Sequence, residues 1–129
     1  MSKKLFVEIV SPDREVWAGE GDMVIAKTVE GEIGVMPGHV PVLSLLAQDA
    51  VVRVLGARET GEVKAAAHGG YVSVSGEGRV SILAETAELA EDIDVDRARQ
   101  ALTSATEEGD SLAAGRARSR LRAAGEEVA

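Results

Sequence analysis

The sequence predicts an α+β protein of two domains, an N-terminal antiparallel β-sandwich of about ten strands over residues 1–85 and a C-terminal antiparallel α-helical hairpin over residues 86–129. Turn residues recur about every ten positions before Ala84, which suits short strands that pair with near neighbours. After Ala84 glycine thins out, and alanine and charged residues dominate. Only three aromatic residues are present, so the core must consist of Val, Ile, Leu and Ala.

The N-terminal part contains a series of short alternating segments. We expect strands at residues 5–10, 14–18, 22–29, 50–55, 62–68, 71–75 and 79–84, and the apolar run 42–46 leaves its type open. Residues 11–13, with the sequence Ser-Pro-Asp, form a turn, so the first two strands are expected to pair as a hairpin. Residues 56–61 are a polar loop, and the glycines at 69–70 and 76–78 mark further turns.

Helical structure is predicted from Glu85 onward. Asp94 is the expected N-cap of the first helix, Gly109 and Asp110 form a reverse turn, and Asp110 or Ser111 caps the second helix. Two apolar stripes recur at three- and four-residue spacing and can face each other: Val95, Ala98, Leu102 and Ala105, and then Ala114, Ala117, Leu121 and Ala124.

The stripes of this hairpin bury little apolar surface. Alanine removes far less area from water than leucine, at ~25 cal/mol per Å². Gly115 also lies inside the second helix, at a cost of ~1 kcal/mol relative to alanine. We therefore expect two weakly paired helices that can open or be displaced by a partner, while the strand-rich part stays folded.

The stretch 31–41 has glycine or proline at five of its eleven positions, so it cannot be one regular strand or helix throughout. Tight turns are expected at Pro37 and Gly38, with Ile33, Val35 and Met36 buried beneath this corner. His39 either holds the corner through a hydrogen bond or faces a partner.

No constellation for catalysis or metal binding is visible. His39 and His68 lie on separate predicted elements, cysteine is absent, and neither a Gly-x-Ser-x-Gly elbow nor a phosphate-binding P-loop occurs. The net charge of -8 and the scarcity of aromatic residues disfavour nucleic-acid binding. No apolar run approaches the ~20 residues of a membrane-spanning helix, and residues 1–5 lack the apolar segment of a signal peptide. We expect a non-catalytic intracellular protein without a metal or resident cofactor, which reaches a membrane only through a partner.

Every basic residue after Ala84 is an arginine: Arg97, Arg99, Arg116, Arg118, Arg120 and Arg122. The guanidinium group suits planar recognition of carboxylates and phosphates. Arg116 and Arg120 share one helix face, and Arg118 and Arg122 form a neighbouring row. On the residues alone, these side chains pair with nearby carboxylates or keep an alanine-rich helix soluble.

The order of residues in the stretch 31–41 resembles the signature G-x-[IL]-G-[IV]-x-P-G-H-x-P-[VL] of epsilon subunits of rotary F-type ATP synthases. The matching residues are Gly31, Ile33, Gly34, Val35, Pro37, Gly38, His39, Pro41 and Val42. The resemblance implies a central-stalk subunit at the cytoplasmic face of a bacterial cell membrane, which couples proton-driven rotation to ATP synthesis. It implies contacts with the gamma subunit and the c-ring through Glu30, Gly31, Glu32, Pro37, Gly38 and His39.

The same resemblance implies that the hairpin is regulatory. When extended, it would carry Arg116, Arg118, Arg120 and Arg122 to an acidic surface of the catalytic alpha and beta subunits and inhibit ATP hydrolysis. When folded down, it would permit rotation.

Ile93-Asp94-x-x-Arg97-Ala98 is similar to the I-D-x-x-R-A motif with which some bacterial epsilon subunits bind ATP. The resemblance implies a site formed by Glu88, Ile93, Asp94, Arg97, Ala98, Arg116 and Arg120. Ser104 stands where ATP-binding members can carry a further arginine, which lowers the expected affinity. Two alternatives stay open, an ATP-sensing module whose hairpin closes on nucleotide and an unrelated sandwich adaptor with a helical tail.

Overall fold

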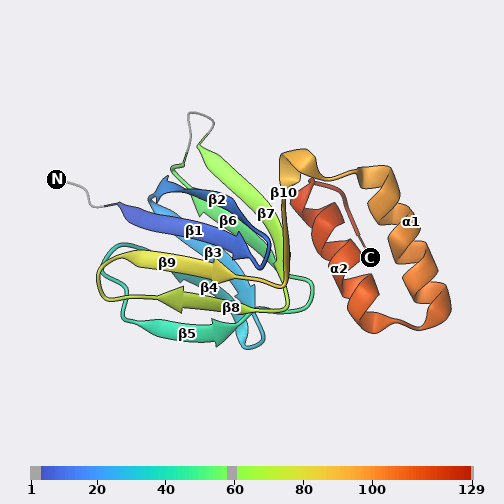
Figure 1. Cartoon of the computed structure of the whole chain (residues 1–129), viewed down its shortest axis with the longest axis horizontal. Helices are drawn as coiled ribbons and strands as arrows, with labels where there is room; N and C mark the ends of the chain where they lie inside the picture. Colours follow the sequence, from blue (N-terminus) through green and yellow to red (C-terminus); the bar gives the residue numbers. More distant parts are fainter. Residues whose placement is uncertain (1–3, 58–60, 129) are drawn as a thin grey trace.

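The computed structural model describes residues 4–57 and 61–128. Within them, ten strands form two five-stranded sheets that stack face to face, and two α-helices pack beside one end of the sandwich (Figure 1). This confirms the predicted α+β class, with a β-sandwich followed by a helical hairpin. The first three residues and positions 58–60 of the predicted loop 56–61 lie outside the described residues.

The two sheets have different strand orders. The first contains, from edge to edge, β2 (Arg14–Gly21), β1 (Leu5–Ser11), β9 (Arg79–Leu83), β8 (Tyr71–Val74) and β5 (Val42–Leu45). The second contains β10 (Thr86–Leu89), β7 (Glu62–His68), β6 (Val51–Leu55), β3 (Met23–Thr28) and β4 (Gly31–Val35). Neighbouring strands are antiparallel except for β1 and β9, which run parallel. The predicted hairpin of the first two strands is confirmed, and the open segment 42–46 contains a strand.

The core lies between the sheets and is aliphatic, as the composition predicts. Alternate residues of each strand point into it, because successive side chains of a strand face opposite sides of the sheet. The fully buried members include Leu5, Val7, Ile9, Val72, Val80 and Ile82 from the first sheet and Val24, Val35, Val52 and Val54 from the second. Trp17 is partly buried and packs against this cluster.

The expectation that helical structure begins at Glu85 is wrong. Residues Thr86–Leu89 form β10, which pairs antiparallel with β7 and completes the second sheet. A four-residue strand is too short to show a distinctive period, and unpaired backbone groups at the edge of β7 decide its conformation. A short 3₁₀ turn, η1 (Ala90–Asp92), then leads to the first α-helix. The domain division at residue 85 stays a prediction, and the sheet continues beyond it to Leu89.

The glycine-proline corner is divided between a strand and a turn. Its first half is β4, and the backbone N–H of His39 then donates to the carbonyl oxygen of Met36 at 3.0 Å. Gly38 occupies the left-handed region at φ +91°. Val35 is buried, whereas Met36 is 57% exposed, so its predicted burial is wrong. Met36 follows the last residue of β4, at the point where the chain leaves the sheet and enters the turn.

The helical hairpin consists of α1 (Val95–Glu108) and α2 (Ser111–Ala123). The predicted N-caps are confirmed, because Asp94 accepts a hydrogen bond from the Arg97 backbone N–H and Asp110 accepts one from that of Ala113. Gly109 ends α1 in the left-handed conformation. In Figure 1, α2 lies between α1 and the sandwich, and it contacts both α1 and strands β6 and β7.

Candidate functional site

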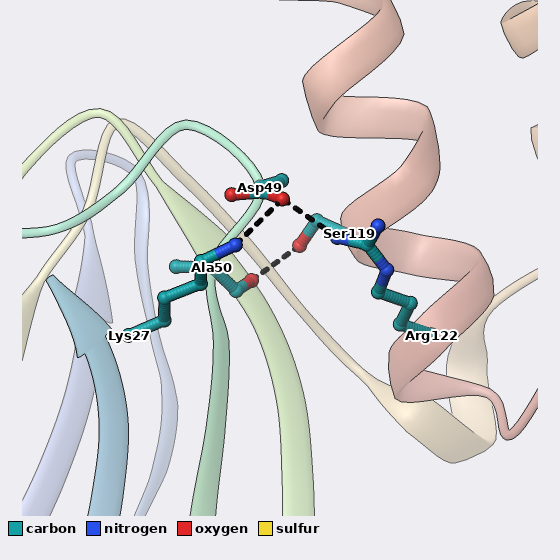
Figure 2. Close-up of polar contacts among 5 residues, drawn as sticks. All are labelled: Lys27, Asp49, Ala50, Ser119 and Arg122. Carbon is teal, nitrogen blue, oxygen red and sulfur yellow. Dashed lines mark hydrogen bonds and ion pairs between the residues drawn. The ribbon is translucent and has the colours of Figure 1, made fainter. Parts of the chain in front are cut away.

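The junction between α2 and the second sheet is held by polar contacts with the loop that precedes β6 (Figure 2). The fully buried hydroxyl of Ser119 donates to the carbonyl oxygen of Ala50. One oxygen of Asp49 accepts from Nη1 of Arg122 at 2.6 Å and from Nζ of Lys27 at 2.9 Å. We call Lys27, Asp49 and Arg122 the Asp49 cluster.

The Asp49 carboxylate stays charged in this setting. Burial raises its pKa, but the hydrogen bonds from Lys27 and Arg122 outweigh the burial and leave the pKa below its usual value. The cluster is therefore a lasting ionic contact at neutral pH. It is only partly buried, so water screens it and its contribution to the docking of α2 is modest.

Small side chains allow α2 to approach this loop closely. A Cβ placed on Gly115 would lie 3.5 Å from the Cβ of Gln48. Gly115, Ser119 and Arg122 are four and three residues apart, so they share one helix face. The sequence pattern missed this face because none of the three is apolar, and the alanine stripe covers only part of the contacts of α2.

His68 lies beneath α2 on the outer face of β7. Its ring is 5% exposed, and a hydrogen bond of 2.5 Å joins its Nδ1 to the hydroxyl of Thr86 on β10. Its Nε2 is buried and has no hydrogen-bond partner among the residues that the structure describes. Burial, as the largest cause, and the positive charges of Arg120 and Arg116 together lower the pKa of His68 to about 4. The ring is therefore neutral at neutral pH.

Two cavities flank His68 between α2 and the edge of the second sheet. One, of about 180 Å³, is lined by Arg14, Glu88 and Arg120 in addition to His68 and its neighbours. The other, of about 400 Å³, is lined by Gln48, Glu85, Thr86, Leu112 and Arg116. Each cavity thus combines at least one arginine with one carboxylate and the buried imidazole.

These cavities bring together three of the seven residues predicted for an ATP site, namely Glu88, Arg116 and Arg120. The other four, Ile93, Asp94, Arg97 and Ala98, line neither cavity. Asp94 caps α1, Ala98 is buried and Arg97 is exposed. In this arrangement the I-D-x-x-R-A segment forms the start of α1 and does not line the two cavities.

Fewer arginines of the hairpin form ion pairs with carboxylates than the many acidic residues nearby in the sequence suggest. Arg99 pairs with Glu126, and Arg122 pairs with Asp49. Among the described residues, no carboxylate lies within 4 Å of the cationic groups of Arg97, Arg116, Arg118 and Arg120. Three of these unpaired arginines lie on α2, where they are half-buried.

The residues predicted to contact the gamma subunit and the c-ring fall into two groups. Glu30, Gly31 and Glu32 lie at the start of β4, and Pro37, Gly38 and His39 follow its end. Residues 33–36 separate the two groups, which corresponds to about 17 Å of extended chain between Glu32 and Pro37. Nδ1 of His39 lies 2.7 Å from the carbonyl oxygen of Val40, so its ring contacts the corner itself.

A row of apolar side chains crosses the outer face of the first sheet. Leu45 pairs with Tyr71, Tyr71 pairs with Leu83, and Leu83 pairs with Val10, so the four side chains are neighbours across four strands. Leu45, Tyr71 and Leu83 are 50%, 46% and 44% exposed, and they line a depression of about 650 Å³. We call these four residues the apolar row. Such a patch on a sheet face indicates a surface that a partner covers.

The sequence contained a signal for this row that the strand predictions did not use. Residues 79–84 place Leu83 between Ile82 and Ala84, both of which are buried in the structure, so both faces of this strand carry apolar residues. A strand with one solvated face would alternate more strictly between apolar and polar residues.

Among the residues that the structure describes, no group of three or more histidine or acidic side chains could hold a metal ion. No helix in this part of the chain has both the length and the apolar content needed to cross a bilayer.

Comparison with known proteins identifies relatives along the whole chain. Residues 4–90 match the family described as "ATP synthase, Delta/Epsilon chain, beta-sandwich domain". The chain is 69% identical to the ATP synthase epsilon chain of Thermobifida fusca, over 100% of this chain and 98% of that protein. It is 48% identical to the epsilon chain of Streptomyces griseus, over 95% and 97% of the two chains.

Solved structures share the fold at lower identity. A chain of the Euglena gracilis mitochondrial ATP synthase, in a structure of OSCP, F1 and the c-ring, has a TM-score of 0.70 at 24% identity, over 92% of this chain and 75% of that chain. A chain of the central stalk and c-ring of the Tetrahymena thermophila mitochondrial ATP synthase has a TM-score of 0.54 at 18% identity, over 76% and 72%.

Proposed function

The chain belongs to the family of ATP synthase epsilon chains, and from that premise we propose that it is a non-catalytic rotor subunit of a bacterial F-type ATP synthase. Its sandwich docks on the gamma subunit and the c-ring, couples proton-driven rotation to ATP synthesis, and holds the protein peripherally at the cytoplasmic face of the membrane. The apolar row carries this proposal, because an exposed sheet face with four aligned apolar side chains is suited to a lasting contact.

We propose that the apolar row binds the gamma subunit and that the residues at the two ends of β4 contact the c-ring. The row suits a dry protein contact, since its residues lie side by side on a rigid sheet. Glu30, Glu32 and His39 are polar residues at the ends of a short strand, and they suit contact with the polar loops of a rotating ring. The two surfaces would let one stiff body transmit torque between two neighbours.

The hairpin is the proposed regulator of ATP hydrolysis. Its second helix is attached to the sheet by one buried hydroxyl contact, the Asp49 cluster and small side chains. Detachment exposes Arg116, Arg118, Arg120 and Arg122 together. In the docked state the first three form no ion pair with any described residue. An acidic surface of the alpha and beta subunits would then attract this helix and stop rotation in the hydrolytic direction.

Reconstitution into an ATP synthase that lacks its own epsilon chain tests the proposal. The full chain should restore proton-driven ATP synthesis, because the sandwich completes the rotor. A chain that ends at Ala90 retains all ten described strands and should restore synthesis as well, but it should raise ATP hydrolysis severalfold. Failure of the full chain to restore synthesis, or equal hydrolysis rates with both chains, would contradict the respective part of the proposal.

A second function, nucleotide sensing, is favoured by the two cavities beside His68. They place Arg14, Arg116 and Arg120 around spaces of about 180 and 400 Å³ under α2, and guanidinium groups recognise phosphates well. In this proposal the docked hairpin would close on ATP, and bound ATP would hold α2 on the sheet.

Calorimetry with magnesium and ATP tests nucleotide sensing. The proposal expects measurable binding to the full chain, and the double variant Arg116→Gln with Arg120→Gln should lose it because both cavities lose their helix-borne cation. Arg118→Gln is the matched control, since Arg118 lines neither cavity. Binding weaker than about 1 mM in the full chain would leave only the mechanical role.

A further inference from the structure

His68 is the buried titratable group at the junction that the hairpin must break in order to move. It belongs to the outer face of β7, so it stays with the sandwich when α2 leaves. The cavities on its two sides are bounded by Arg120 and Arg116, which lie one helical turn apart on α2. The ring therefore lies under the docked helix, between two positive charges.

The charged groups around His68 come from three elements and one connecting residue, and they differ in whether they leave with the helix. They are Arg14 on β2, Glu85 just before β10, Glu88 on β10, and Arg116 and Arg120 on α2. When α2 leaves, its two arginines leave with it, whereas both carboxylates remain beside the ring. The surroundings of His68 thus become more negative and more hydrated, and both changes favour the imidazolium ion.

Nε2 of His68, which has no hydrogen-bond partner among the described residues, also favours release of the helix on protonation. A buried polar atom without a hydrogen bond destabilises the state that buries it, and a charged N–H in that position would be costlier still. Exposure to water would supply a partner for this atom. The docked state therefore tolerates the neutral ring and strongly disfavours the charged one.

We propose that His68 is a proton sensor for hairpin docking: α2 rests on the second sheet while the imidazole is neutral, and protonation of the ring releases the helix. This inference rests on the proposed function, because it needs a hairpin that leaves the sheet. It adds the signal that triggers the release. Acidification around the protein would favour the extended, inhibitory form of the hairpin.

The sign and range of the effect follow from linkage. In the docked state the pKa of His68 is about 4, against an ordinary value of 6.5. The docked state therefore binds fewer protons, so docking has its full strength above pH 6.5 and weakens as pH falls towards 4. If release restores the ordinary pKa, the docking constant falls up to about tenfold between pH 7.5 and 5.5. The pKa of Asp49 lies below its usual value, so the Asp49 cluster stays ionised across this window.

Distance measurements on the full chain can test this sensor. The chain has no natural cysteine, so Glu20→Cys on the sandwich and Ser104→Cys on α1 give two exposed labelling sites. Spin labels there report the docked fraction by pulsed electron paramagnetic resonance between pH 8 and pH 5. We expect the docked fraction of the labelled parent to fall mainly in the lower half of this range, with a docking constant that changes up to about thirtyfold between pH 8 and pH 5.

Variants at the two histidines separate the sensor from general acid effects. His68→Gln should flatten the pH profile, because glutamine stays neutral, whereas His39→Gln should leave the profile of the parent unchanged. If His68→Gln does not fold, Arg116→Gln with Arg120→Gln gives the same information. That pair should keep more of the hairpin docked at pH 5, since it removes the charges that oppose protonation. A flat profile in the parent, or an unchanged slope in the folded His68→Gln variant, would overturn the proposal.

A variant with a broken Asp49 cluster distinguishes failure of the sensor from failure of the mobile hairpin. At pH 8, Asp49→Asn with Ser119→Ala should lower the docked fraction without involving His68. If this variant opens and the parent does not respond to pH, the sensor is refuted and the mobile hairpin stands. If the hairpin stays docked in this variant and at every pH, both proposals fail.

Discussion

Replacing Leu45 and Tyr71 together with aspartate is expected to weaken binding to the gamma subunit by at least about a hundredfold. The two residues face each other across β5 and β8 at the centre of the apolar row. In a formed interface each new carboxylate would lose its water without gaining a partner, at roughly 1–3 kcal/mol or more per group. Since 1.4 kcal/mol corresponds to a factor of ten, a penalty of about 1.4 kcal/mol or more at each of the two positions gives the predicted loss.

The measurement is the affinity of the full chain for purified gamma subunit, with circular dichroism as a check of the fold. Both side chains are about half exposed in the free chain, so their replacement should not unfold the sandwich. Leu112→Asp provides a matched control. Leu112 is also 50% exposed but lies on α2, and this variant should bind gamma as the parent does. Undiminished binding of the double variant would show that gamma docks elsewhere.

The strands of the sandwich could be predicted because local alternation determines them. Residues such as Leu5, Val7 and Ile9 repeat at period two, and turn residues mark where each strand ends. The pairing of β1 with β9 could not be predicted in the same way. It joins segments more than 70 positions apart and is parallel, and a local pattern contains no information on which distant strand becomes the neighbour.

The site was predictable only where its residues form a local motif. The caps Asp94 and Asp110 could be predicted because a side chain three residues before a free backbone N–H is enough to fix a cap. The contacts of Ser119 with Ala50 and of Arg122 with Asp49 span 69 and 73 positions. Neither Ser119 nor Arg122 is apolar, so the apolar stripe of the predicted helix included neither of them.

The alanine stripe predicted a hairpin that can detach. The structure adds a reason why the docked and detached states of α2 can be close in free energy. The contacts of α2 with the sheet are made by glycine, serine and a shared carboxylate, and few large apolar side chains are involved. Polar contacts of this kind can be exchanged for water when the helix leaves. Leu121, which is 1% exposed, is the one large apolar side chain of α2 that is buried.

A reversible covalent bond between α2 and the sandwich would prevent release without removing any part of the chain. The Cβ position of Gly115 lies 3.5 Å from the Cβ of Gln48, within the range of about 3.5–4.5 Å found in disulfides. The chain has no cysteine of its own, so Gln48→Cys with Gly115→Cys forms one defined pair. Oxidation should fix the docked state, and a reductant should free it.

The central claim is that detachment of α2 causes the inhibition. The most direct test is to measure ATP hydrolysis by the assembled complex that contains this double-cysteine chain. Hydrolysis should be severalfold faster after oxidation than after reduction, and the oxidised rate should match that of the chain that ends at Ala90. Proton-driven ATP synthesis should be the same in both states, because the sandwich is unaffected. Equal hydrolysis rates before and after reduction, with the disulfide verified by mass spectrometry, would contradict the mobile-hairpin mechanism.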